Sequence, residues 1–192
     1  MGYVILAVVV VALFWVVSAY NRLIALKNRV VNAWKQIDVQ LKFRHDLIPN
    51  LVNTVKGAME HERGTLEAVI AARNRAISAE GVQATAAAEG ALTQALGRLF
   101  ALGEADPDLK AAGNIGALQE QLTSTESKIA FARQLYNDVA TQYNTAQLQF
   151  PTNLVAGLAK ASPAELWEIE DAAERAVPQV DLSSPSRTPP AA

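Results

Sequence analysis

The chain opens with an unbroken apolar run. Residues 3–20 (YVILAVVVVALFWVVSAY) contain no charged side chain. As a helix rising about 1.5 Å per residue they would extend roughly 27 Å, close to the hydrocarbon thickness of a bilayer. Neither the basic stretch nor the cleavage site of a secretory signal flanks this run. We therefore expect an uncleaved transmembrane anchor, with four aromatic side chains in the membrane or at its surface: Tyr3, Phe14, Trp15 and Tyr20.

A heptad pattern follows the apolar run without a linker. One set of apolar positions is Leu23, Val30, Ile37 and Leu51, and the other is Trp34, Leu41, Ile48 and Val55. Two such sets are typical of a helix in a coiled coil or a helical bundle. The pattern therefore predicts that the anchor continues directly into the first bundle helix.

This helix has a weak point near Pro49. Proline lacks the backbone N–H of a helical hydrogen bond, and Arg44 falls on the apolar seam. The sequence permits either a kink or a helical hairpin here, and the kink is favoured because the seam keeps its register across the proline. A kink would leave residues 150–151 far from the bilayer. A hairpin would bring them back and make residues 154–158 a second membrane contact.

Two more long helices are expected downstream. Leu66, Ile70 and Ile77 continue the first helix with a rotated apolar face, to an end at Gly81. A second helix covers residues 82–102, and a loop with the turn Asp106-Pro107-Asp108 covers residues 103–113. A third helix covers residues 115–150, where apolar positions recur at alternating three- and four-residue steps. Its length predicts that it lies along the first helix.

The C-terminal part is predicted as short helices and a tail. Residues 152–161 form a short apolar helix, and a capping box at residues 162–165 (SPAE) opens another through residue 176. The proline-rich residues 177–192 are expected to be extended or disordered. The fold class is all-α, with an N-terminal transmembrane helix that continues into an antiparallel up-and-down bundle of the four-helix type. Residues 1–20 are the anchor, residues 21–176 the bundle and residues 177–192 the tail.

Local charge orients the bundle relative to a membrane. Arg22, Lys27 and Arg29 follow the anchor directly. By the positive-inside rule they place the bundle in the cytoplasm and the short N-terminus outside, and they favour anionic lipids. The net charge of the chain is −2, which gives no general electrostatic case for binding nucleic acid.

No residue pattern in the sequence indicates catalysis or a cofactor. The chain has no cysteine, and His45 and His61 lie on different faces of a straight helix without the partners that a helical zinc site needs. No serine stands in the glycine frame of a nucleophile elbow. We therefore expect a protein that is not an enzyme, with no metal site and no cofactor.

Amide side chains recur on two of the predicted helices. Asn21, Asn28, Asn32 and Gln36 step along a flank of the first helix, and Asn137, Asn144 and Asn153 recur near the end of the third. Buried amides would fix the register between helices, whereas exposed amides would suit a partner or an oligomer contact. Both alternatives are open. The candidate bundle or oligomer contacts are Asn28, Asn32, Trp34, Gln36, Ile37, Leu41, Pro49, Tyr136, Asn137, Tyr143 and Phe150.

Several segments are similar in order and wording to one known family. The segments are YNRLIALKNRVVNAWKQIDVQLKFRHDLIPNLVNTVKG, HERGTLEAVIAAR, ALGRLFALGEADPDLKA, LQEQLTSTESKIAFARQLYNDVATQYN and FPTNLVAGL. They resemble the LemA family. The resemblance implies a bacterial membrane protein with one N-terminal transmembrane helix, a small exterior N-terminus and a helical bundle inside the cell. A branch of the family is associated with magnetosome membranes, which implies a role in membrane organisation, and the family supplies no catalytic residues. The chain lacks the family's usual aromatic residues near Asp106, at residues 113–115 and at residues 158–167.

Two functions are consistent with these features. The leading hypothesis is a non-enzymatic, membrane-anchored helical scaffold that self-assembles and organises or remodels a membrane. The alternative is an adaptor or sensor that presents its cytoplasmic bundle to a membrane protease or a signalling protein. The expected partners are membrane lipids, further copies of the chain and a membrane protein, without nucleic acid. The expected location is the inner (cytoplasmic) membrane of a bacterium.

Overall fold

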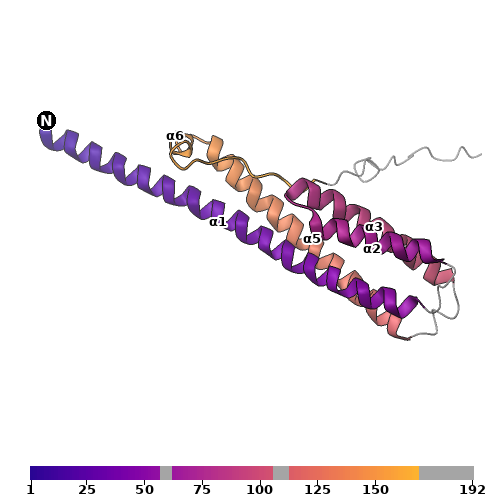
Figure 1. Ribbon diagram of the computed structural model, residues 1–192. Helices are drawn as coiled ribbons and strands as arrows, with labels where there is room; N and C mark the ends of the chain where they lie inside the picture. The colour runs from indigo at the N-terminus through magenta and orange to yellow at the C-terminus, as the bar shows by residue number, and fades with distance from the viewer. Residues whose placement is uncertain (57–61, 106–112, 169–192) are drawn as a thin grey trace, which may run out of the picture.

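The fold is that of a computed structural model, which describes residues 1–56, 62–105 and 113–168 (Figure 1). All regular secondary structure in these ranges is helical, as the sequence predicts. The helices are α1 (Gly2–Val55), α2 (Arg63–Ser78), α3 (Val82–Ala105), α5 (Gly113–Leu148) and α6 (Asn153–Ala156). Several sequence predictions lie outside the described residues: His61, the turn Asp106-Pro107-Asp108, the part of the last predicted helix after residue 168, and the tail over residues 177–192.

Helix α1 is unbroken through Pro49, so the hairpin alternative is wrong. The helix has 54 residues and is therefore about 80 Å long. Because proline has no N–H, the carbonyl of His45 loses its helical hydrogen bond. The Nε of Arg73 on α2 donates a hydrogen bond of 2.7 Å to this carbonyl instead. A side chain from the neighbouring helix thus replaces the bond that Pro49 cannot make.

The first helix does not continue to Gly81, which corrects a second expectation. Helix α1 ends at Val55, and α2 begins at Arg63 as a separate helix. Gly81 lies in the turn between α2 and α3 with a φ of 83°, a conformation that glycine adopts without steric cost. Helices α2 and α3 therefore form a hairpin beside the part of α1 that lies farthest from its N-terminus (Figure 1).

The order of helix directions explains where the chain ends up. Helices α1 and α3 run away from the N-terminal end, and α2 and α5 run back (Figure 1). Helix α5 packs along α1 as predicted, and α6 contacts α1. Residues 150–151 therefore return toward the anchor end of α1 although α1 contains no hairpin. A first helix without a hairpin is expected to leave these residues far from the anchor end, and this expectation is wrong. Helices α1 and α2 run in opposite directions, which adds one reversal that the sequence did not predict.

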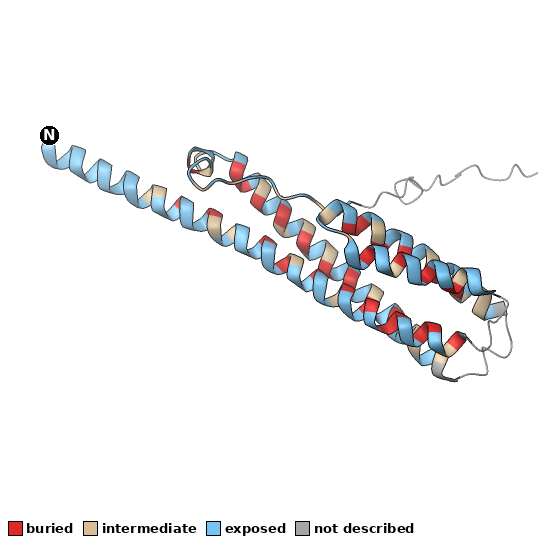
Figure 2. Ribbon diagram, in the orientation of Figure 1, coloured by how far each residue is buried: buried red, intermediate tan, exposed pale blue. Residues whose placement is uncertain are grey.

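Two clusters of buried side chains form the core, on the facing sides of the helices (Figure 2). In the distal cluster all four long helices contribute, among them Leu51, Val69, Leu92 and Leu122. In the proximal cluster α1 and α5 contribute most residues, among them Ile37, Ile129 and Tyr136. The bundle therefore has four helices in its distal half and mainly two in the half nearer the anchor.

The predicted helix after the capping box at residues 162–165 is wrong over its described part. Helix α6 covers only Asn153–Ala156, and residues 161–168 form no helix. Their backbone runs as an extended segment along α5, and its polar groups bond to side chains of other helices rather than to one another. The hydrogen bonds to α5 therefore take the place of the helical ones.

The packing predicts that Leu51→Ala destabilises the bundle strongly. Leu51 is fully buried in the distal cluster, and truncating such a leucine costs about 2–5 kcal/mol because a cavity remains. Chemical denaturation of the protein in detergent, followed by circular dichroism, measures this change. The matched control is Leu135→Ala, since Leu135 is 44% exposed and should change the free energy of unfolding much less. Equal effects of the two substitutions would contradict the assignment of the core.

Candidate functional site

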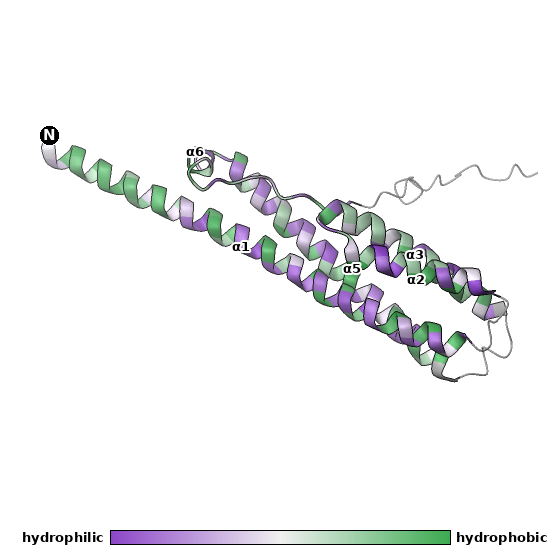
Figure 3. Cartoon of the chain, viewed as in Figure 1, coloured by the Kyte–Doolittle hydropathy of each residue, from purple (hydrophilic) through white to green (hydrophobic). Residues whose placement is uncertain are grey.

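The N-terminal part of α1 projects from the bundle with an apolar surface (Figure 3). It is the one helix among the described residues that is long and apolar enough to cross a membrane. The helix has almost no protein cover in this part, since Tyr3 is 90% and Phe14 is 77% exposed. Trp15 is partly buried, and Tyr20, at 40%, is exposed near the start of the bundle.

The bundle begins within one helical turn of the anchor. Ala19 and Leu23 are the first buried residues of α1. The basic residues predicted to lie near the membrane surface are Arg22, Lys27 and Arg29, and all three are exposed. Because one rigid helix carries both the apolar part and the basic residues, the height of the bundle above a membrane would be fixed by α1 itself.

A second apolar surface lies where α5 and α6 meet. Leu148, Phe150, Leu154 and Leu158 are between 65% and 82% exposed, whereas Val155 packs inward at 2% exposure. We call these four exposed residues the α5–α6 tip. The tip lies beside α1 near the start of the bundle, on the side from which the anchor projects (Figure 1). Phe150, predicted as a bundle or oligomer contact, is 79% exposed and does not pack in the bundle.

A buried charged cluster joins the helices between the two apolar clusters. Arg44 of α1 is 2% exposed and forms ion pairs with Glu89 of α3 and Glu126 of α5. Its Nη2 also donates to the Glu89 carbonyl at 3.2 Å, and its Nη1 donates to the Thr93 hydroxyl at 3.1 Å. His45 lies 2.6 Å from the second carboxylate oxygen of Glu89. The arginine on the seam therefore marks a three-helix ion-pair cluster.

Sequence reasoning missed this cluster, although one signal for it was present. Glu89 stands three residues from both Ala86 and Leu92, on the apolar stripe of α3. A carboxylate on a buried stripe predicts a buried cation beside it, because an unpaired charge in the core is very costly. Within the cluster Glu89 pairs with both Arg44 and His45, and Glu126 also lies 3.9 Å from the guanidinium of Arg133. Among the described residues, no three acidic, histidine or cysteine side chains come together in a way that would hold a metal ion.

Two asparagines of α5 hold the extended segment 161–168. The Asn144 side chain accepts a hydrogen bond of 2.7 Å from the Ala164 N–H and donates one of 2.8 Å to the Ala164 carbonyl. Asn137 forms the same pair of bonds with the N–H and carbonyl of Trp167, at 2.8 and 2.9 Å. We call these two residues the asparagine clamp. Asn137 and Asn144 therefore contact this segment rather than fixing the register between two helices, and Asn153 is exposed.

An aromatic pocket receives the indole of Trp167, which is 5% exposed. Trp34 of α1 lies 6.0 Å from Trp167 and 5.4 Å from Tyr136, measured between ring centroids, and the Arg133 guanidinium lies 5.7 Å from the centroid of the indole. The Tyr136 hydroxyl donates a hydrogen bond of 2.7 Å to the Glu165 carbonyl. Burial, and secondly the charge of Glu165, raises the pKa of Tyr136, so the phenol keeps this proton.

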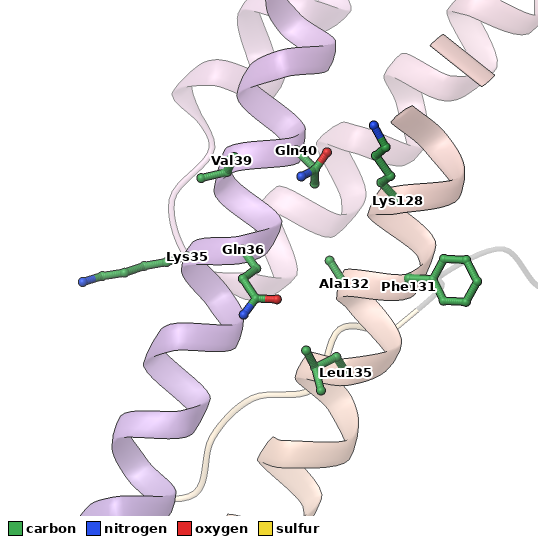
Figure 4. Close-up of a pocket in the computed structure, with 8 residues that line it drawn as sticks. All are labelled: Lys35, Gln36, Val39, Gln40, Lys128, Phe131, Ala132 and Leu135. Atoms are coloured by element: carbon green, nitrogen blue, oxygen red, sulfur yellow. The ribbon is translucent and has the colours of Figure 1, made fainter. Parts of the chain in front are cut away.

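The opposite side of the α1–α5 pair is an open groove (Figure 4). Gln36, Gln40 and Ala132 point between the two helices, and Phe131 points outward from α5. The other lining residues are Lys35, Val39, Lys128 and Leu135. Phe131 is 75% and Val39 is 63% exposed, so no part of the described chain covers this side.

The remaining predicted contacts divide into buried and exposed residues. Ile37, Leu41, Tyr136 and Tyr143 are buried, and Trp34 is partly buried. Asn28, Asn32, Gln36 and Pro49 are exposed. Amides on the first helix therefore do not fix the register of this bundle from within, and that alternative is wrong for them. Pro49 makes no buried bundle contact, because its ring lies on the outer side of α1.

The charged cluster predicts that Glu89→Ala is strongly destabilising. The substitution leaves Arg44 and His45 without their shared partner, and breaking a buried ion pair in this way costs about 3–5 kcal/mol. Chemical denaturation measures the loss. Arg44→Met combined with Glu89→Leu should cost clearly less than the two single substitutions together, since no buried charge is stranded. Glu67→Ala, at an exposed acid of α2, is the control, and an equally small effect at Glu89 would contradict the cluster's role.

The asparagine clamp predicts faster amide exchange in Asn137→Ala. Two hydrogen bonds to Trp167 are lost, at about 1 kcal/mol each, so the N–H of Trp167 should exchange roughly thirtyfold faster. Hydrogen–deuterium exchange of the full chain in detergent measures the rate. Asn153→Ala, at an exposed asparagine, should leave it unchanged. An unchanged rate in both variants would show that the clamp does not hold the segment in solution.

Comparison with known proteins agrees with the geometry. A model of the LemA family matches residues 33–182, which include residues 33–55 of α1, all of α2, α3, α5 and α6, and the clamped segment. No curated protein matches the chain. Since the matched range is well over half of the sequence, the chain belongs to the LemA family.

Proposed function

We propose that this LemA protein is a non-enzymatic, membrane-anchored scaffold whose copies assemble side by side and organise the membrane that holds them. The observation that carries the proposal is the open groove of the α1–α5 pair, which stands on the same rigid helix as the anchor. Neighbouring copies in one membrane would present this groove at the same height and in the same orientation.

The membrane part of the proposal rests on two surfaces. Residues 3–20 of α1 would cross the bilayer, and the basic residues Arg22, Lys27 and Arg29 would lie at the cytoplasmic leaflet of a bacterial inner membrane, with the N-terminus outside. The α5–α6 tip lies beside the anchor's exit and offers exposed apolar side chains to the same leaflet. Two contacts separated along the surface would restrain the tilt of the bundle as well as its height.

The self-assembly part rests on the chemistry of the open groove. Contiguous exposed apolar surface is typical of protein or membrane interaction sites. Phe131 and Leu135 supply apolar surface, and Gln36 and Gln40 supply amides that both donate and accept hydrogen bonds. Such amides can pair with the same amides of a second copy, as a two-fold symmetric contact requires. Lipid tails are excluded as the cover, because the groove lies on the cytoplasmic side of the proposed bilayer.

The non-enzymatic part rests on how the ionisable side chains are used. Arg44 and His45 are buried and both contact the buried carboxylate of Glu89, so these polar groups stabilise the packing of α1 against α3. In the described residues we find no nucleophile beside a base and an orienting group, the arrangement that acid–base or nucleophilic catalysis requires. We propose accordingly that the protein acts through its surfaces, without a cofactor.

Self-assembly predicts that Phe131→Glu weakens association between copies. A buried phenylalanine contributes about 1.5–3 kcal/mol, so the association constant should fall at least about tenfold when a charge replaces it. Mass photometry of the full chain in lipid nanodiscs and detergent measures the distribution of oligomers. Ile77→Glu is the matched control, because Ile77 is 52% exposed on α2, away from the groove.

Mass photometry and cross-linking in cells together distinguish the alternative functions. A wild-type protein that is monomeric at every concentration would contradict the scaffold. Cross-linking in cells that captures one stoichiometric foreign membrane protein, rather than further copies, would favour the adaptor instead. Loss of association in Ile77→Glu as well as in Phe131→Glu would show that charge alone, and not the groove, controls assembly.

A further inference from the structure

The asparagine clamp binds the backbone of an extended segment. Each asparagine bonds both the N–H and the carbonyl of one residue, so neither bond depends on the side chain of that residue. Asn137 and Asn144 are seven residues apart, or about 10.5 Å along a helix. Ala164 and Trp167 are three residues apart, or about 10 Å along an extended strand. The two repeats match, which is why α5 can hold a peptide at two points without bending it.

The aromatic pocket adds selectivity to this backbone contact. Trp34 and Arg133 contact the indole of Trp167, and Tyr136 packs edge-on against Trp34. The carbonyl of Leu166 accepts a hydrogen bond of 2.8 Å from Gln83 on α3. The asparagine clamp and the aromatic pocket together form a surface that we call the clamp groove. It fits an extended peptide that has a small residue beside Asn144 and a tryptophan three residues later. This chemistry defines the ligand class of the site.

We propose that the clamp groove is a peptide site that segment 161–168 of a second copy can occupy, so that neighbouring copies exchange their segments. The proposal rests on the proposed function, because exchange needs neighbouring copies in one membrane. Segment 161–168 lies on the side of the α1–α5 pair opposite the open groove, so exchange joins each copy to a second neighbour across that side. Every copy carries a segment of the right chemistry, and the contacts of the exchanged segment are identical to those within one chain. Exchange of an identical element is a low-cost route to association for this reason.

The connection before the segment provides a hinge. Lys160 has a φ of 46°, in the left-handed region that a residue with a side chain adopts only at a cost in free energy. Glycine at 157 and exposed residues at 157, 158 and 160 make the connection accessible. An extended connection that reaches a neighbour would release the strain at Lys160. It would also break the hydrogen bonds from the Lys160 N–H to the Gly157 carbonyl (3.2 Å) and from the Ala161 N–H to the Ala156 carbonyl (3.0 Å), which the contacts with the neighbour must offset.

The membrane anchor allows exchange within a closed pair of copies. Copies with one anchor each stand parallel, so a two-fold axis along the membrane normal keeps the clamp groove and the segment at one height in both copies. Each copy then gives its segment and receives one. Confinement to a membrane also raises the effective concentration of the neighbour's segment toward that of the chain's own.

Mixed cross-linking of full-length chains tests the exchange. The chain has no cysteine, so Gln83→Cys marks the groove in one version and Leu166→Cys marks the segment in another. The two versions are co-expressed and treated in membranes with a short bis-maleimide. Exchange gives a covalent dimer of the two versions. Adding Asn137→Ala and Asn144→Ala to the Leu166→Cys version leaves its segment intact and releases that segment from the clamp groove of the same chain. These substitutions should not lower the dimer yield. Adding them to the Gln83→Cys version should lower the yield at least fivefold.

Two controls separate the outcomes. A chain with both Gln83→Cys and Leu166→Cys shows that the reagent joins groove and segment. Gln40→Cys chains, marked in the open groove, report side-by-side assembly alone. Dimers through Gln40→Cys without mixed dimers through Gln83→Cys and Leu166→Cys would overturn the exchange and leave the scaffold standing. Absence of both would overturn both. A foreign protein joined to Gln83→Cys in place of the second copy would also overturn the exchange.

Discussion

The ion pairs of Arg44 hold the bundle at the point where its architecture changes. On the side of Arg44 nearer the anchor, α1 and α5 form most of the core. On the far side of Arg44, α2 and α3 join them. A buried guanidinium must be paired, because an isolated charge in an apolar core is very costly. Arg44 meets that requirement with one carboxylate from α3 and one from α5, so only one register of the three helices satisfies it.

The neighbouring turn of α1 is also joined to α2 through a polar group that needs a partner from another helix. Pro49 frees the carbonyl of His45, and Arg73 bonds it. The residue that weakens α1 therefore also supplies a docking point for the α2–α3 hairpin. Because α2 runs back along α1 and α3 runs away again, α5 returns toward the anchor end. The α5–α6 tip reaches the anchor end of α1 only because of these reversals.

The α1–α5 pair is left with two unlike sides. One side is filled by segment 161–168 through the asparagine clamp and the indole of Trp167. The other side keeps Phe131 and Val39 exposed along an open groove. The scaffold function that we propose uses these two sides of the α1–α5 pair.

Local pattern in the sequence determined the parts of the fold that repeat along one helix. The heptads fixed α1, the alternating three- and four-residue steps fixed α5, and the apolar run fixed the candidate membrane helix, because periodicity reports directly which side of a helix is buried. Tertiary structure alone decided what lies far apart in sequence. Arg44 finds Glu89 and Glu126 across 45 and 82 residues, and Asn137 finds Trp167 across 30. The capping box at residues 162–165 was a sound local signal that lost to the hydrogen bonds of α5, since a backbone already bonded to side chains gains nothing from forming a helix.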